Sequence, residues 1–129
     1  MLAVEIKDKV VLITGSNRGI GTSFVEKALE LGAAKVYATA RNTGSLTDLA
    51  AANPERVVLL NLDICDQRQV DAVAAAAQDV DVLINNAGAG GGGAIVAANN
   101  EAPKRMEMDI NYFGTMKMSV AFAPIVKAN

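Results

Sequence analysis

Residues 10–21 read Val-Val-Leu-Ile-Thr-Gly-Ser-Asn-Arg-Gly-Ile-Gly, and they carry the strongest structural signal in the chain. The apolar, partly β-branched run at 10–13 predicts a buried strand. Gly15, Gly19 and Gly21 follow it and open a segment of helical spacing. Glycines at such a turn permit positive φ and let the backbone approach a phosphate, while a helix N-terminus adds free N–H groups. The stretch therefore predicts a nucleotide-binding turn, with an ordinary tight turn as the alternative.

Three further apolar runs, at 35–39, 57–60 and 80–84, alternate with segments of helical character. Continuous apolar runs of this length are typical of strands covered on both faces, although any single run would also suit a buried helix. With right-handed crossovers, this order predicts an α/β protein with an open, doubly wound parallel sheet, in a single domain over residues 1–129.

Helices are expected between these strands. The first should end at Gly32 in a left-handed cap, and a weaker one over 45–52 should stop before Pro54. Asp66 and Gln69 have the spacing of a capping box at the start of the third helix. The expected apolar stripes comprise Ile20, Phe24, Val25, Ala28 and Leu31 in the first helix, and Val70, Val73, Ala74 and Ala77 in the third.

A long last helix is expected over 102–126, after a glycine patch at 90–93 that predicts a mobile loop. At 100° per residue its apolar residues fall on two opposed sides, so the helix should be covered on both. One side comprises Met106, Ile110, Phe113, Val120 and Ala121, and the other comprises Met108, Tyr112, Met116, Phe122 and Val126.

Composition excludes several classes of protein. The 129 residues are 51% hydrophobic and carry a net charge of -2, so we expect no nucleic-acid partner. No apolar run approaches the roughly 20 residues that span a bilayer, so we expect no membrane contact. The single cysteine, Cys65, fits a cytoplasmic setting. The absence of histidine excludes Ser-His relays and imidazole ligands, and no metal site is expected.

Two arginines bear on the choice of nucleotide. Proteins that bind NAD at such a turn place a carboxylate about 20 residues further on, where it binds the ribose hydroxyls. Here the second strand ends at Arg41 and Asn42, without a carboxylate. Arg41 and Arg18 together would hold a 2′-phosphate, which favours NADP over NAD, unless both arginines are simply solvated.

Four motifs follow one another along the chain. They are Thr14-Gly15-x-x-x-Gly19-Ile20-Gly21, Leu62-Asp63-Ile64, Asn85-Asn86-Ala87-Gly88 and Asp109-Ile110-Asn111-Tyr112-Phe113-Gly114. Together they resemble the classical short-chain dehydrogenase/reductase family. The resemblance runs from about residue 8 to residue 129 and implies a Rossmann-like fold with strand order 3-2-1-4. It also implies a dinucleotide cofactor, NADP or NAD, and oxidation or reduction of a small carbonyl or alcohol substrate.

The resemblance implies roles for individual residues. Asp63 would accept a hydrogen bond from the adenine beside the backbone of Ile64, and Asn111 would hold a water in a catalytic proton relay. The segment 85–88 would pass under the adenosine ribose, where Asn86 would either contact the cofactor or only brace the fold at the strand end. The other structural alternatives are a turn aspartate at Asp63 and a helix bend at Asn111. The other implied cofactor-binding residues are Gly15, Ser16, Asn17, Arg18, Gly19, Ile20, Gly21, Arg41, Asn85, Ala87 and Gly88.

The chemistry of that family also needs a serine and a Tyr-x-x-x-Lys pair downstream of the asparagine helix. Tyr37 and Tyr112 are followed at the fourth position by Arg41 and Met116, so neither fits. We therefore expect only the cofactor half of the fold, truncated after the fourth strand and its long helix, without dehydrogenase activity alone. The open edge of the fourth strand and the last helix then predict a homo-oligomer or domain swap. A non-catalytic nucleotide-binding module and an assembly module remain alternatives.

Overall fold

The computed structural model describes residues 4–97 and 99–129. Its centre is one parallel sheet of four strands in the order β3-β2-β1-β4, as predicted. The fold is therefore the Rossmann-like open sheet that the sequence indicated. The strands are β1 Val10–Thr14, β2 Lys35–Ala40, β3 Val57–Asn61 and β4 Val82–Ile84.

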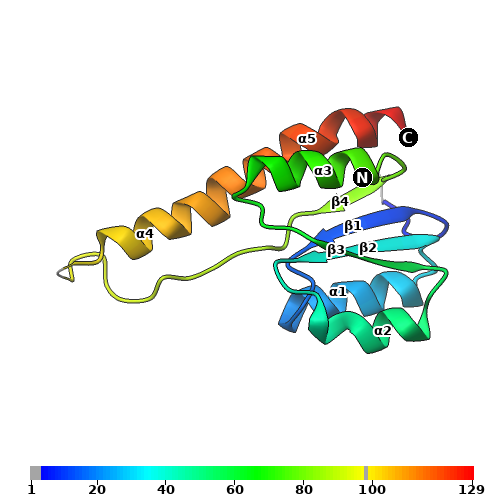
Figure 1. Ribbon diagram of the computed structural model, residues 1–129, viewed down its shortest axis with the longest axis horizontal. Helices are drawn as coiled ribbons and strands as arrows, with labels where there is room; N and C mark the ends of the chain where they lie inside the picture. The colour runs from blue at the N-terminus through cyan, green and yellow to red at the C-terminus, as the bar shows by residue number, and fades with distance from the viewer. Residues whose placement is uncertain (1–3, 98) are drawn as a thin grey trace.

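Helices cover both faces of the sheet. In Figure 1, α1 and α2 lie below the sheet, α3 and α5 lie above it, and α4 projects away from it. A short 3₁₀ turn, Gly44–Leu46, precedes α2, and a π-helix, Asp109–Gly114, joins α4 to α5. The α-helices are α1 Gly19–Glu30, α2 Thr47–Ala52, α3 Gln67–Ala76, α4 Glu101–Met108 and α5 Thr115–Ala128.

The alternation of side chains along β1 divides the core into two layers. Val11 and Ile13 pack with Val25 and other residues on the side of α1 and α2. Leu12 packs with Phe122 and its neighbours on the side of α3 and α5. All five side chains are fully buried, because β1 lies between β2 and β4 and is covered on both faces.

β4 begins two residues later than the apolar run at 80–84 predicts. The carboxylate of Asp81 accepts a hydrogen bond from the backbone N–H of Val10 at 2.8 Å and lies 3.6 Å from the ammonium of Lys9. A side chain therefore satisfies the first N–H of β1. β4 is at the edge of the sheet, as expected.

The apolar stripe predicted for α1 is only partly correct. Val25 and Ala28 are buried, but Ile20 is 69% exposed, and Phe24 and Leu31 also face solvent. The helix lies so close to the sheet that its first buried position is a glycine, Gly21, rather than the neighbouring isoleucine. The predicted cap is confirmed, since Gly32 has a φ of +83°.

The capping box predicted for α3 is wrong in detail. The carboxylate of Asp66 accepts from the backbone N–H of Arg68 at 2.9 Å, one residue earlier than a capping box requires. The Gln69 side chain instead bridges two aspartates: its Oε1 accepts from the N–H of Asp63, and its Nε2 donates to Asp66. The stripe on α3 is confirmed, because Val70, Val73 and Ala77 are buried.

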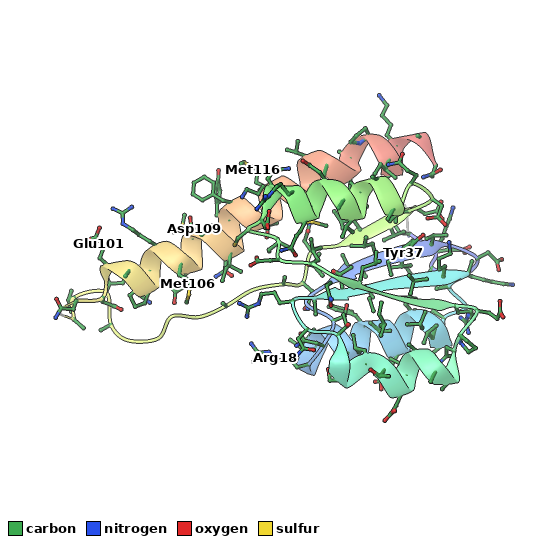
Figure 2. The ribbon with its side chains drawn as sticks, in the orientation of Figure 1. Arg18, Tyr37, Glu101, Met106, Asp109 and Met116 are labelled. Carbon is green, nitrogen blue, oxygen red and sulfur yellow. The ribbon has the colours of Figure 1, made fainter. Side chains whose placement is uncertain are left out.

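The last helix is not uniform, and the two faces predicted for it are wrong. The π-helix adds residues to one turn, so the buried positions of α5 fall out of phase with a constant 100° per residue. Phe122 is buried together with Met118 and Ile125, whereas Val120 is 69% exposed. Several large apolar side chains remain exposed along the helix; Figure 2 labels two of them, Met106 and Met116. The exposed set is Met106, Met108, Tyr112, Phe113, Met116 and Val120.

In the part of the chain that the structure describes, no helix combines the length and hydropathy needed to cross a membrane. Over the same residues, no group of three or more histidine, cysteine, aspartate or glutamate side chains is placed to hold a metal ion.

Candidate functional site

A cleft of about 720 Å³ lies at the carboxyl ends of the four strands. In an open parallel sheet, ligands bind outside this edge, where the loops from adjacent strands diverge. The glycine turn after β1 forms one wall and the segment after β4 forms another. The lining residues are Gly15, Asn17, Arg18, Gly19, Ile20, Gly21, Ala40, Arg41, Asn42, Leu62, Asp63, Ile64, Asn86, Ala87, Gly88, Ala89 and Ile110.

The glycines of the turn are needed for close packing. A Cβ at Gly15 would lie 2.8 Å from the Cα of Ala87, and the φ of Gly15 is +65°. A Cβ at Gly21 would lie only 1.9 Å from the carbonyl oxygen of Gly15. A Cβ at Gly19 would meet nothing within 4 Å, so this glycine borders open space. The turn therefore presses the start of α1 against β1 and leaves its outer surface free for a ligand.

Among the described residues, no side chain caps the N-terminus of α1. Its N-cap residue, Arg18, has extended backbone angles and makes no side-chain cap hydrogen bond, and the first turn holds no acidic residue. The N–H groups of a helix's first turn have no intrahelical partner and carry partial positive charge. This end of α1 therefore suits an anion in the cleft.

Two guanidinium groups add positive charge to the same cleft. Arg18 precedes α1, as Figure 2 shows, and Arg41 follows β2. Neither side chain makes a hydrogen bond or ion pair with another described residue. The two loops are joined by the Ser45 hydroxyl, which donates to the carbonyl of Asn17 at 2.7 Å. The arginines are thus held on neighbouring loops with their charges free for an anion.

Asp63 supplies the only carboxylate among the described residues that line the cleft. Its Oδ1 accepts from the backbone N–H of Cys65 at 2.9 Å, which fixes the side chain in a turn after β3. The second carboxylate oxygen is not used in that bond. Asp63 therefore combines the turn role with a place on the cleft surface.

The segment after β4 is fastened to the glycine turn. The Thr14 hydroxyl accepts from the backbone N–H groups of Asn86 and Ala87, at 3.0 and 2.9 Å. The Asn86 amide donates to the carbonyls of Thr14 and Gly15, at 3.0 and 3.1 Å. Asn86 is therefore a brace between β1 and β4, and it also lines the cleft.

Asn111 lies within the π-helix and binds the same segment. Its Oδ1 accepts from the backbone N–H of Ala89 at 2.9 Å, and its Nδ2 donates to the carbonyl of Ala89 at 2.8 Å. A Cβ at Gly88 would lie 3.3 Å from that Oδ1, so a larger residue there would press on the contact. Asn111 lies in the π-helix, and the neighbouring Ile110, rather than Asn111, lines the cleft.

The cleft brings together all of the predicted cofactor-binding residues except Ser16 and Asn85. Ser16 is turned inward, fully buried, and its hydroxyl donates to the carbonyl of Ile13 at 2.8 Å. The Asn85 amide instead donates to the hydroxyl of Ser119 on α5, at 3.2 Å. The side chains of both residues bond to other parts of the protein and do not line the cleft.

Five lining residues were not predicted. Four of them neighbour predicted residues at strand ends, where the rule that ligands bind beyond the carboxyl ends of strands would have indicated them. Ile110 gave no such signal, because its place depends on the course of the π-helix. The five are Ala40, Asn42, Leu62, Ala89 and Ile110.

An open parallel sheet with helices on both faces and a glycine turn leading into α1 defines a Rossmann-like α/β protein. Within that class, the family model described as short chain dehydrogenase matches residues 9–129. The chain belongs to the short chain dehydrogenase family.

Individual relatives agree with this assignment. The chain is 33% identical over 129 residues to galactitol 2-dehydrogenase of Agrobacterium fabrum, covering 97% of this chain and 50% of that protein. A short chain dehydrogenase from Burkholderia cenocepacia, solved in complex with NADP, has a TM-score of 0.90 at 40% identity, covering 98% of this chain and 52% of that one. A family member from Burkholderia phymatum, solved with NAD, has a TM-score of 0.81 at 33% identity, covering 95% and 46%. The chain thus spans about half the length of the curated relatives it matches.

Proposed function

We propose that this chain binds NADP(H) in the cleft and forms the cofactor half of an oxidoreductase acting on a carbonyl or alcohol substrate. The observation that carries the proposal is that Arg18 and Arg41 both line the cleft into which the uncapped N-terminus of α1 opens. The pyrophosphate of a dinucleotide is negatively charged, and the 2′-phosphate of NADP(H) adds to that charge. Guanidinium groups bind such anions through several hydrogen bonds at once.

The residues of the cleft fit the parts of such a cofactor. The N–H groups at the start of α1 would bind the pyrophosphate, and the open side of Gly19 leaves room for it. Asp63 would accept from the adenine amino group, and Arg18 and Arg41 would hold the 2′-phosphate. When bound, the nicotinamide supplies or accepts the hydride. The structural relatives solved with NADP and with NAD support the cofactor class, and the two arginines favour NADP.

Four narrower proposals go with this one. Residues 1–129 act as a single, incomplete dinucleotide-binding domain. Asn111 serves the reaction by fixing the segment at Ala89 and holding a water at the opened helix turn. Residues 1–129 bind cofactor without reducing a carbonyl by themselves, because neither Tyr37 nor Tyr112 has a lysine four residues later. A second copy of the chain is the proposed cover for the exposed apolar side chains of the last helix or for the edge of β4.

The cofactor proposal is tested by isothermal titration calorimetry, which measures the dissociation constants of NADPH and of NADH. We expect NADPH to bind more tightly. Arg41→Ala should weaken NADPH binding by about tenfold or more, because hydrogen bonds to charged groups contribute roughly 1.5–3 kcal/mol, and should leave NADH binding nearly unchanged.

Arg68→Ala is the matched control, since this arginine lies on α3 with 95% of its side chain exposed and outside the cleft. It should leave both affinities unchanged. Binding of neither dinucleotide would refute the proposed function and leave the assembly module. An equal loss of NADPH and NADH affinity in Arg41→Ala would refute the 2′-phosphate role.

A further inference from the structure

Glu107 does not line the cleft, but it is hydrogen-bonded to the loop that forms one wall of the cleft. One carboxylate oxygen accepts a hydrogen bond from the backbone N–H of Gly91. Both oxygens lie 3.2 Å from the ammonium of Lys104, one turn earlier on α4. The Gly91 hydrogen bond, and after it the Lys104 contact, lower the pKa of Glu107, so the carboxylate is charged at neutral pH.

The contact at Gly91 is one of a pair. Asn111, four residues after Glu107, holds both backbone groups of Ala89. The two side chains therefore hold two residues of the segment, Ala89 and Gly91, which are two apart along the chain.

The loop is also packed closely against α4 at this point. A Cβ at Gly91 would lie 2.8 Å from the carbonyl oxygen of Pro103. Gly88 and Ala89, three and two residues before Gly91, line the cleft. Described residues 85–97, 99 and 100 form no helix or strand, and Figure 1 shows this segment running away from the sheet toward the start of α4, the end of that helix farthest from the sheet. The segment is therefore held in place by hydrogen bonds to Glu107 and Asn111, since it has no helix or strand of its own.

We propose that Glu107 is a positioning residue that, by holding Gly91 beside α4, fixes the place of Gly88 and Ala89 in the cleft wall. The consequence for cofactor binding rests on the proposed function, whereas the fastening of the loop does not. Amide hydrogen exchange measures the fastening, and dinucleotide titration measures the consequence.

In the wild-type protein, the Gly91 amide should exchange at least tenfold more slowly than that of Gly90, whose N–H has no partner among the described residues. Glu107→Ala should remove this protection and weaken NADPH binding about three- to tenfold. Glu107→Gln, which keeps an acceptor oxygen, should retain part of both. Glu101→Ala is the control: it removes an exposed carboxylate on α4 that pairs with Arg105 at 2.8 Å, and it should change neither reading.

Equal exchange at Gly90 and Gly91 in the wild type would overturn the inference without any variant, even if Glu107→Ala failed to fold. Lost protection in Glu107→Ala with unchanged NADPH affinity would overturn the positioning role. A wild-type protein that binds no dinucleotide but shows the protected Gly91 would refute the proposed function and uphold the fastening of the loop.

Discussion

The charge on the Asp66 carboxylate makes the free energy of unfolding depend on pH. The hydrogen bond from the backbone N–H of Arg68, and after it the bond from Gln69, lower the pKa of Asp66 below its ordinary value of about 3.9. A carboxyl with a lowered folded-state pKa stabilises the protein above its unfolded-state pKa, and this contribution is lost as the pH falls through the folded-state pKa.

We therefore expect Asp66→Ala to lower the urea midpoint at pH 7, with the difference from wild type shrinking as the pH falls below about 4. Asp71→Ala is the control, because among the described residues that carboxylate accepts only from the Gln67 side chain, on the exposed surface of α3. A difference that stays constant from pH 7 to pH 2 would contradict the role of the charge.

Individual glycines explain why the site could be located from sequence. At Gly15 and Gly21, backbone atoms lie within 3 Å of the place a Cβ would take, so only glycine fits. Such a steric requirement can be read from the sequence as a glycine at a fixed position. Side chains that organise the site from behind, such as Ser16, leave no comparable mark, because a serine satisfies its hydroxyl equally well inside or outside a cleft. Glu107 gave no signal either, since its partner is a backbone N–H on an irregular loop.

At the scale of elements, α5 depends on one large aromatic side chain. Phe122 is fully buried between α5, α3 and the sheet, although the helix periodicity placed it on the same side as the exposed Met116. Phe122→Ala should destabilise the protein by about 3–5 kcal/mol in urea unfolding, because it removes buried apolar area and leaves a cavity. Val120→Ala, at a position 69% exposed, should change the stability by less than about 0.5 kcal/mol. Equal losses in the two variants would mean that the phase of α5 is wrong.

The elements themselves were largely predictable, and the reasons are local. Each strand is a continuous apolar run, so it can be predicted without knowing which helix packs on it. All four strands were predicted to within two residues of their bounds. The phase of the last helix was not predictable, because one π turn at Asp109–Gly114 shifts every later residue and the sequence pattern assumes a constant pitch. The buried face of α1 failed for a different reason: contact with the sheet begins at Gly21, a residue that hydrophobicity patterns ignore.

At the scale of the molecule, the exposed apolar side chains of the last helix predict self-association. Six large apolar residues of this helix are between 44% and 69% exposed, and contiguous apolar patches of this kind mark interaction surfaces. We expect the wild-type protein to sediment as a dimer or larger species at micromolar concentration. The double variant Met116→Lys, Val120→Lys places two charges on one helix face and should shift it to the monomer.

Val4→Lys is the matched control for that experiment, since Val4 is 72% exposed but lies outside the last helix. It should sediment like the wild type. A compact wild-type monomer in dilute solution would contradict the prediction, and a double variant that remains associated would move the interface to the edge of β4.

The bonds from Asn86 to Thr14 and Gly15 also set the order of events during synthesis. They join positions 71 and 72 residues apart, and β1 has no partner on its β4 side until residues 82–84 exist. Contacts so distant along a chain are slow to form, because a large loop must close first. A nascent polypeptide on the ribosome therefore carries its glycine turn without this brace until residues 82–86 have been synthesised and have emerged.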